Sequence, residues 1–398
     1  MKRTSLKLFM ILAINASLIT SCTSDNNETK DNKPTSSFVV NANSLKGTIT
    51  EGEVVLNAGT TYKLTGKLQV NDGATLTIPA GTIIEGIGGT ASYIAVAQGG
   101  KLNVNGTATS PVIMTSGLAT KNAGDWGGVV ICGRAPINRI SGGTGTAQPE
   151  VADLTYGGTI ANDNSGSIKY LRIEYAGAAF NSEKEFNGMS LFGVGSGTTI
   201  DHVEAYHGAD DGFEFFGGTV NTSNLISIGN EDDQFDWTEG WNGTNTNWYG
   251  KLDFGKGNRG IEADNYEFGY ANAPVANPTI TNLTLIGAGS TADATTYVEN
   301  QGVKLRRGTK GILTNVVLSA WKTGVDVEND ETIANIGTSL KVSTINFSSD
   351  VPAKTKGKKT DATNADVSAI ITSESSSATG AGNGTSMPSW ASGWSVGF

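Results

Sequence analysis

One five-residue pattern occurs six times in this chain: a turn-type pair followed by an apolar, a polar and an apolar residue. The copies begin at positions 187, 211, 233, 259, 301 and 323, so the steps between them are 24, 22, 26, 42 and 22 residues. A second short apolar run precedes four copies, at 202–205, 224–228, 282–286 and 315–318. Two strands about every 22 residues, with glycine and asparagine between them, are typical of a β-solenoid. The sequence therefore predicts an all-β chain of stacked coils of about 22–24 residues.

The polar residue at the centre of each copy should face away from the core. Side chains alternate between the two faces of a strand, so Glu214 points outward if Phe213 and Phe215 point inward. The same reasoning turns a series outward: Ser190, Asp236, Glu262, Lys304 and Asp326. It turns another series inward: Met189, Phe213, Phe235, Val303 and Val325. Because stacked coils lie about 4.8 Å apart, the outward acids Glu214, Asp236 and Glu262 should form a ladder of mutually repelling carboxylates.

A bound cation would relieve this repulsion. Ca²⁺ takes six to eight oxygen ligands, and carboxylates on adjacent coils could supply several of them. We predict a site for Ca²⁺ or another divalent cation made by Asp210, Asp211, Glu214, Asp232, Asp233, Asp236 and Glu262. Four aromatic residues nearby in sequence are predicted to stack on a ligand: Phe216, Trp241, Trp248 and Tyr249. The alternative is a solvated acidic face that only keeps the solenoid soluble.

The N-terminus has the features of a lipoprotein signal. A positive region with Lys2, Arg3 and Lys7 precedes the apolar run 8–19, and small residues precede Cys22. We predict a signal peptide over 1–21, acylation of Cys22 and a lipid anchor in the outer membrane, with the protein at the cell surface. Removing three positive residues changes the formal charge from −10 to −13, which disfavours nucleic acid as a partner.

The remaining boundaries follow from composition. Residues 22–37 are polar and are predicted to be a disordered tether. The solenoid domain is predicted over 38–350, and 240–258 is expected to be a long loop or an irregular coil. The segment 351–398 is rich in Ser, Thr, Ala and Lys, and is predicted to be a low-complexity loop whose Trp390 and Trp394 fold back as a C-terminal cap.

Several segments together resemble a known family. The lipoprotein signal, the Asp-Trp-Gly-Gly segment at 125–128 and the acidic-aromatic blocks at 210–218 and 232–241 are similar to those of Bacteroidetes surface lipoproteins. Those proteins are right-handed parallel β-helices of pectin-lyase-like fold and are related to leptospiral surface lipoproteins. The resemblance implies a right-handed parallel β-helix with coils of about 22–24 residues. It also implies an association with a TonB-dependent outer-membrane receptor.

Three functions are compatible with this sequence. The first is a lipid-anchored surface protein that captures a nutrient, glycan or small ligand through its acidic, cation-binding face. The second is a cation-dependent polysaccharide lyase or another glycan-active enzyme. A lyase would need a basic residue near the cation, and Lys304 and Arg306 are the candidates. The third is a structural or adhesive surface module.

Overall fold

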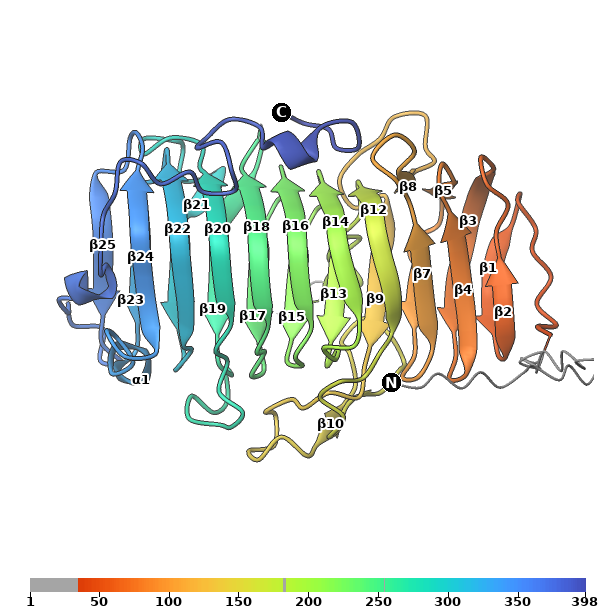
Figure 1. The fold of residues 1–398 in the computed structure, drawn as a ribbon, viewed down its shortest axis with the longest axis horizontal. Helices are drawn as coiled ribbons and strands as arrows, with labels where there is room; N and C mark the ends of the chain where they lie inside the picture. Colours follow the sequence, from red (N-terminus) through yellow and green to blue (C-terminus); the bar gives the residue numbers. More distant parts are fainter. Residues whose placement is uncertain (1–34, 182–183, 254) are drawn as a thin grey trace, which may run out of the picture. The chain divides into compact units, whose positions relative to one another are not determined.

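Parallel pairing between coils organises this protein. The structure is a computed structural model, and it describes residues 35–181, 184–253 and 255–398. Its strands follow one another in the order of a solenoid (Figure 1), and the pairings between the coils are parallel. Within the described residues the only α-helix is α1 (Asp330–Ile333). The β-solenoid predicted from the repeat, and the right-handed parallel β-helix that the resemblance implies, are thus confirmed.

The six copies of the repeated pattern lie on one ladder of strands. Met189, Phe213, Phe235, Val303 and Val325 occupy equivalent inward positions in this ladder and are fully buried, as predicted. The rings of Phe213 and Phe235 stack with their centroids 5.7 Å apart. The strands of this ladder are β1 (Leu45–Ile49), β3 (Thr61–Val70), β6 (Gly89–Val96), β9 (Trp126–Cys132), β13 (Met189–Phe192), β15 (Phe213–Phe216), β17 (Phe235–Thr238), β19 (Gly257–Asp264), β21 (Tyr297–Arg306), β23 (Thr323–Glu328) and β25 (Ala353–Lys358).

The solenoid has two further faces. In the first coils each of these faces is formed by its own short strand, and in the later coils one long strand forms both. The short strands are β2 (Gly52–Val55), β4 (Ala74–Pro79), β5 (Ile83–Gly86), β7 (Lys101–Asn105) and β8 (Val112–Ser116). The long strands are β12 (Gly166–Glu174), β14 (Thr199–Tyr206), β16 (Asn221–Ile228), β18 (Thr244–Lys251), β20 (Thr279–Ile286), β22 (Gly311–Ser319) and β24 (Leu340–Phe347).

Each long strand turns at one residue in the left-handed region. These residues are Tyr170, His202, Asn224, Asn247, Asn282, Asn315 and Thr344, with φ between 51° and 67°. Asparagine tolerates this conformation better than other non-glycine residues. The amides also bond from coil to coil, because Asn247 Nδ2 donates to Asn224 Oδ1 and Asn282 Nδ2 donates to Asn247 Oδ1, each at 2.8 Å. This ladder explains why asparagine begins three of the second apolar runs in the repeat.

The structure shows a regular strand where a long loop was expected, and it explains the 42-residue step in the repeat. The segment 240–258 is not a long loop, because β18 forms a regular rung between β16 and β20. The 42-residue step in the repeat is a single coil with insertions, since Glu262 is the direct register partner of Lys304. One of these insertions is the loop 265–278 between β19 and β20.

A second insertion, 133–165, lies between β9 and β12 and contains the antiparallel pair β10 (Thr146–Ala147) and β11 (Tyr156–Gly157). Figure 1 shows this insertion and the loop 265–278 projecting from the same side of the strands. They are fastened together, since Asn138 Nδ2 donates to Asn265 Oδ1 at 2.8 Å and both residues are fully buried. Two segments distant in sequence therefore form one wall.

The C-terminal part differs from the cap predicted over 351–398. The solenoid continues through β25, beyond the boundary expected at 350, and two short 3₁₀ turns follow, η1 (Ser368–Ile370) and η2 (Ser389–Ala391). Residues 378–398, here called the C-terminal strap, run back across the outside of the long strands (Figure 1). Trp394 is fully buried against Tyr170 and His202. The strap therefore covers a flank of the solenoid and does not close its end.

The predicted signal peptide and Cys22 lie outside the described residues, as does the tether 22–37 apart from 35–37. Thr35 already pairs with Glu53 in a parallel bridge, so this end of the predicted tether joins the solenoid. Among the described residues, no helix combines the length and apolar character needed to cross a membrane.

Candidate functional site

The predicted ladder of outward residues is present. Ser190, Glu214, Asp236, Glu262, Lys304 and Asp326 are successive register partners on the strands from β13 to β23. The face is less open than expected. Glu214, Asp236 and Glu262 are half-buried, and Lys304 and Asp326 are buried. Carboxylates in such an environment cannot rely on water to screen their repulsion.

A second row of polar side chains lies just before strands β15 and β17 of the same ladder. Asp211 Oδ1 accepts the backbone N–H of Asp233 at 2.9 Å, and Asp233 Oδ1 accepts that of Arg259 at 2.7 Å. The glycine that follows Asp211 is required by close approach, because a Cβ on Gly212 would lie 2.2 Å from Ser227 Oγ. In the copies that begin at 211 and 233, the aspartate of the turn-type pair thus joins its coil to the next one through the backbone.

Three of these acids have no basic partner. Asp211, Glu214 and Asp236, here called the carboxylate triad, each offer an oxygen within 4.8 Å of the others. No lysine or arginine in the described part of the chain forms an ion pair with any of them. Burial, and then the neighbouring acids, raise the pKa of all three carboxyls well above the usual range.

A buried amide completes the surroundings of the triad. Asn187 is 3% exposed, and its Nδ2 donates to Glu214 Oε2 at 2.7 Å and to Ser190 Oγ at 3.2 Å. Its Oδ1 has no hydrogen-bond partner. A buried carbonyl oxygen left without a donor is unusual, and it needs a cation or a water molecule to satisfy it.

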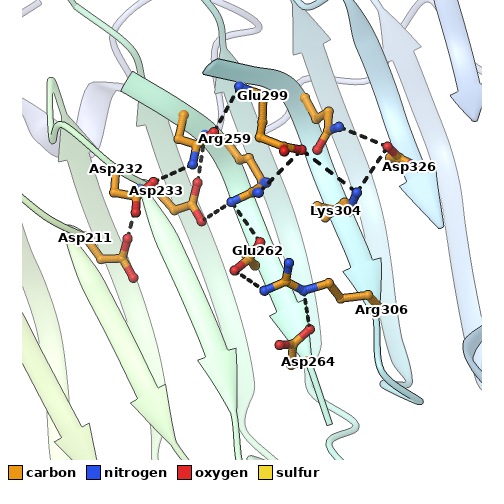
Figure 2. Close-up of polar contacts among 12 residues, drawn as sticks. Asp211, Asp232, Asp233, Arg259, Glu262, Asp264, Glu299, Lys304, Arg306 and Asp326 are labelled. Carbon is orange, nitrogen blue, oxygen red and sulfur yellow. Dashed lines mark hydrogen bonds and ion pairs between the residues drawn. The ribbon is translucent and has the colours of Figure 1, made fainter. Parts of the chain in front are cut away.

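The next coils compensate their acids with arginine (Figure 2). Arg259 Nη1 lies 3.1 Å from Asp233 Oδ2 and 2.7 Å from Glu262 Oε1. Arg306 pairs with Glu262 and, at 2.8 Å, with Asp264 Oδ1. Asp233 and Glu262, both predicted as metal ligands, therefore already have cationic partners. Among the described residues of the ladder, the acids without a cationic partner are those of β15 and β17.

The two remaining predicted ligands form a separate group. Asp210 and Asp232 each offer an oxygen within 4.8 Å of the other and of Asp211. Asp232 Oδ1 accepts Asn258 Nδ2 at 2.6 Å. Burial and the charge of Asp232 raise the pKa of Asp210 well above its usual range. Asp211 therefore connects this group to the triad.

Two residues of the triad, Glu214 on β15 and Asp236 on β17, border a cavity of about 280 Å³, here called the acidic cavity. Arg306 at the end of β21 borders it as well. The two insertions contribute Arg139, Glu150, Tyr266, Glu267 and Phe268 to its wall. Glu239 and Arg307, which directly follow β17 and β21, also border it. Sequence reasoning missed these wall residues, and the only signal for them was the irregular length of the steps between repeats.

Comparison with known proteins agrees with this architecture. A family model described as a pectate-lyase like beta helix domain matches residues 47–395. The chain belongs to this family. No curated protein and no solved structure matches the chain significantly. Membership in the pectate-lyase-like β-helix family accounts for the fold and does not specify a ligand or a reaction.

Within this pectate-lyase-like β-helix, the two side chains considered as lyase bases are held in ion pairs. Lys304 Nζ lies 2.6 Å from Glu328 Oε1 and 3.4 Å from Asp326 Oδ2, and the side chain is 5% exposed. Arg306 is paired with Glu262 and Asp264, and the charges of these acids raise its pKa further. A proton-abstracting base needs a free lone pair near the substrate. The structure therefore argues against a base role for Lys304 and Arg306.

The four predicted stacking residues are also placed differently. Trp241 and Trp248 are fully buried in the main core, where they stack on Phe215 with centroid distances of 4.0 and 5.7 Å. Tyr249 is 2% exposed beneath the C-terminal strap. Phe216 borders the acidic cavity but is 6% exposed and stacked on Phe192. Stacking of a ligand on these rings was a wrong prediction, because the turn at Asn247 directs Trp248 inward and the strap covers Tyr249.

Proposed function

We propose that this protein is a surface binding protein that holds a divalent cation, Ca²⁺ foremost, at the carboxylate triad. The observation that carries the proposal is the convergence of Asp211, Glu214 and Asp236 within 4.8 Å without a basic partner. Three like charges, one buried and two half-buried, are costly when they lie this close, and a divalent cation removes the cost without any change of fold. Arg259 and Arg306 offset the charge of the neighbouring acids through ion pairs.

The donor set supports a hard cation. Carboxylate oxygens from three residues and the unpartnered Oδ1 of Asn187 are the ligand type that Ca²⁺ prefers. Ca²⁺ needs more oxygens than these residues supply, and the acidic cavity leaves room for water or for a ligand. The cation would thus be both a structural counter-charge and a point of ligand attachment.

The location of the protein remains a proposal from its sequence. We expect Cys22 to be acylated and to hold the solenoid at the outer membrane, facing outward. Capture of a nutrient or other small ligand, and its delivery to a TonB-dependent receptor, would suit a lipid-anchored protein with an open cavity. The lipoprotein signal and the polar segment after Cys22 support this arrangement.

A glycan-active enzyme is the second candidate, and one observation favours it. Glu150, Glu214 and Glu239 border one cavity, and burial raises the pKa of each carboxyl above its usual range. A carboxyl whose pKa is raised holds its proton to a higher pH and is better suited to act as a general acid. In this case the acids of the cavity, and not Lys304 or Arg306, would carry the chemistry.

Calorimetry and thermal unfolding test the main proposal. The soluble domain, freed of metal with a chelator, should bind Ca²⁺ and gain melting temperature as Ca²⁺ is added. The double variant Glu214→Gln, Asp236→Asn should lose both effects and keep its fold. The matched control Glu51→Gln, Glu53→Gln removes two exposed acids from an early coil and should retain both effects. A wild-type domain that binds no divalent cation would refute the proposal.

A further inference from the structure

The wall of the acidic cavity carries two aromatic rings that sequence reasoning did not select. Phe268 and Tyr266 both border the cavity, with ring centroids 5.7 Å apart in an edge-on arrangement. Phe268 is 81% exposed. Its ring is therefore available to a ligand, in contrast to the buried rings of Trp241 and Trp248.

The loop that presents these rings is firmly held. Asn265 is fully buried, its Nδ2 donates to the carbonyls of Tyr270 and Asn272 at 3.0 Å, and its Oδ1 accepts the N–H of Ala276 at 2.8 Å. Asn138 of the other insertion bonds to the same side chain. A platform that is already ordered costs little additional entropy when a ligand binds.

The charge of the cavity restricts the kind of ligand. Seven acids and three arginines border it, which gives a net charge of −4 when all are ionised and −2 with one divalent cation bound. The acids are Glu150, Glu214, Asp236, Glu239, Glu262, Asp264 and Glu267.

The arginines are already committed to these acids. Arg139 Nε lies 2.6 Å from Glu239 Oε1, and Arg307 Nη1 lies 2.6 Å from Asp264 Oδ2. Arg306 pairs with that same Asp264 and with Glu262. An anionic ligand would find no unpaired arginine among the residues that border the cavity, and it would meet a negative field even after the cation is bound.

We propose that the cation-loaded acidic cavity binds an uncharged, hydroxyl-rich ring, such as a neutral sugar residue of a glycan, and rejects anionic ligands. This inference rests on the cation site of the proposed function. Hydroxyl groups supply neutral oxygens to a hard cation and can donate hydrogen bonds to Glu150 and Glu239. The apolar face of the ring would pack on Phe268. The cavity volume of about 280 Å³ suits a ligand of the size of a single sugar residue.

A glycan array provides the first test. The Ca²⁺-saturated soluble domain is applied to neutral oligosaccharides and to their uronic-acid counterparts at equal density, with a chelator-treated sample in parallel. We expect binding to neutral glycans, lost with the chelator. The neutral oligosaccharide with the strongest signal and its uronic-acid counterpart are then titrated in solution. Phe268→Ala should weaken binding of the neutral one about tenfold, the worth of one aromatic contact, without changing the affinity for Ca²⁺.

Phe180→Ala is the matched control, because Phe180 is an exposed ring that does not border the acidic cavity. It should leave both affinities unchanged. Three results would overturn the inference: preference for the acidic glycans, unchanged glycan binding by Phe268→Ala, or no glycan binding by a domain that does bind Ca²⁺. A domain that binds neither Ca²⁺ nor glycan would instead refute the proposed function itself.

Discussion

Glu214 and Asp236 are register partners on the adjacent parallel strands β15 and β17, and neither carboxylate forms an ion pair with a lysine or arginine of the described residues. Their 22-residue separation in the sequence becomes the distance between neighbouring coils in the structure. With Asp211 they form the one part of the ladder where no arginine offsets the charge.

The stability of the metal-free protein should depend on pH through the triad. The pKa of each triad carboxyl is raised in the folded state, so the folded protein binds more protons than the unfolded chain above the usual carboxyl range. Stability should therefore fall as pH rises from about 4 through the folded-state pKa values. Melting temperature against pH, measured with a chelator present, should be flatter for Glu214→Gln, Asp236→Asn than for the wild type. A steeper profile for the double variant would show that burial and mutual repulsion do not raise the pKa values of the triad.

Affinity for Ca²⁺ should increase with pH, whereas the stability of the metal-free protein should decrease. Protons and the cation compete for the same oxygens, so Ca²⁺ should bind more tightly as pH rises through the same window. Calorimetric titrations at several pH values check this, and release of protons on binding should accompany it. Affinity that does not change with pH would place the bound cation elsewhere.

Truncation of the core beneath the triad should be costly. Phe213 is fully buried and stacked on Phe235, so Phe213→Ala should lower the free energy of unfolding by about 3–5 kcal/mol. Denaturant titration measures the change. Phe268→Ala removes an exposed ring of the same kind and should change stability by less than about 0.5 kcal/mol. Equal losses in the two variants would show that Phe213 is not a core residue.

The C-terminal strap should loosen as pH rises toward about 8. Glu204 is fully buried beneath the strap and both of its carboxyl oxygens accept the N–H of Val396 at 3.1 Å. Burial raises the pKa of Glu204 to about 8, with Arg172 and Glu174 as its charged neighbours. Protonation thus favours the closed strap between the usual carboxyl pKa and about 8, and the equilibrium should shift toward opening by up to about tenfold per pH unit as pH rises in that window.

Hydrogen-exchange protection of residues 378–398, corrected for the intrinsic pH dependence of exchange, measures this opening. Glu204→Gln keeps an oxygen acceptor for Val396 and cannot ionise, so its protection should be independent of pH. Glu374→Gln changes an exposed acid just before the strap and should behave as the wild type. A pH-dependent loss of protection that persists in Glu204→Gln would exclude Glu204 as the titrating group.

The anchor is tested by a single substitution. Cys22→Ser removes the acylation site expected from the sequence, so the protein should leave the membrane fraction or accumulate as its precursor. Fractionation followed by immunoblotting measures this. Cys132→Ala alters a buried core cysteine and should leave the distribution unchanged. Persistence of the Cys22→Ser protein in membranes would rule out a lipid anchor at this residue.

The sequence by itself determined the coil, its register and the ladder. Side-chain alternation is a local property of a strand, so the apolar–polar–apolar segments already identify Phe213 as inward and Glu214 as outward. Equal spacing between repeats then aligns Glu214 with Asp236. Trp248, in contrast, was selected as a stacking residue only for its nearness in sequence, and the left-handed turn at Asn247 places it in the core.

Only the tertiary structure decided which acids are compensated and what surrounds them. Arg306 reaches Glu262 from the next coil, across the insertions between β19 and β21, and no local pattern encodes that contact. The wall that presents Phe268 depends on Asn138 meeting Asn265, 127 positions away. The strap over Glu204 likewise follows from packing between the end of the chain and its middle. Charge pairing, burial and cavity walls depend on distances in space, and these are fixed only when the coils have stacked.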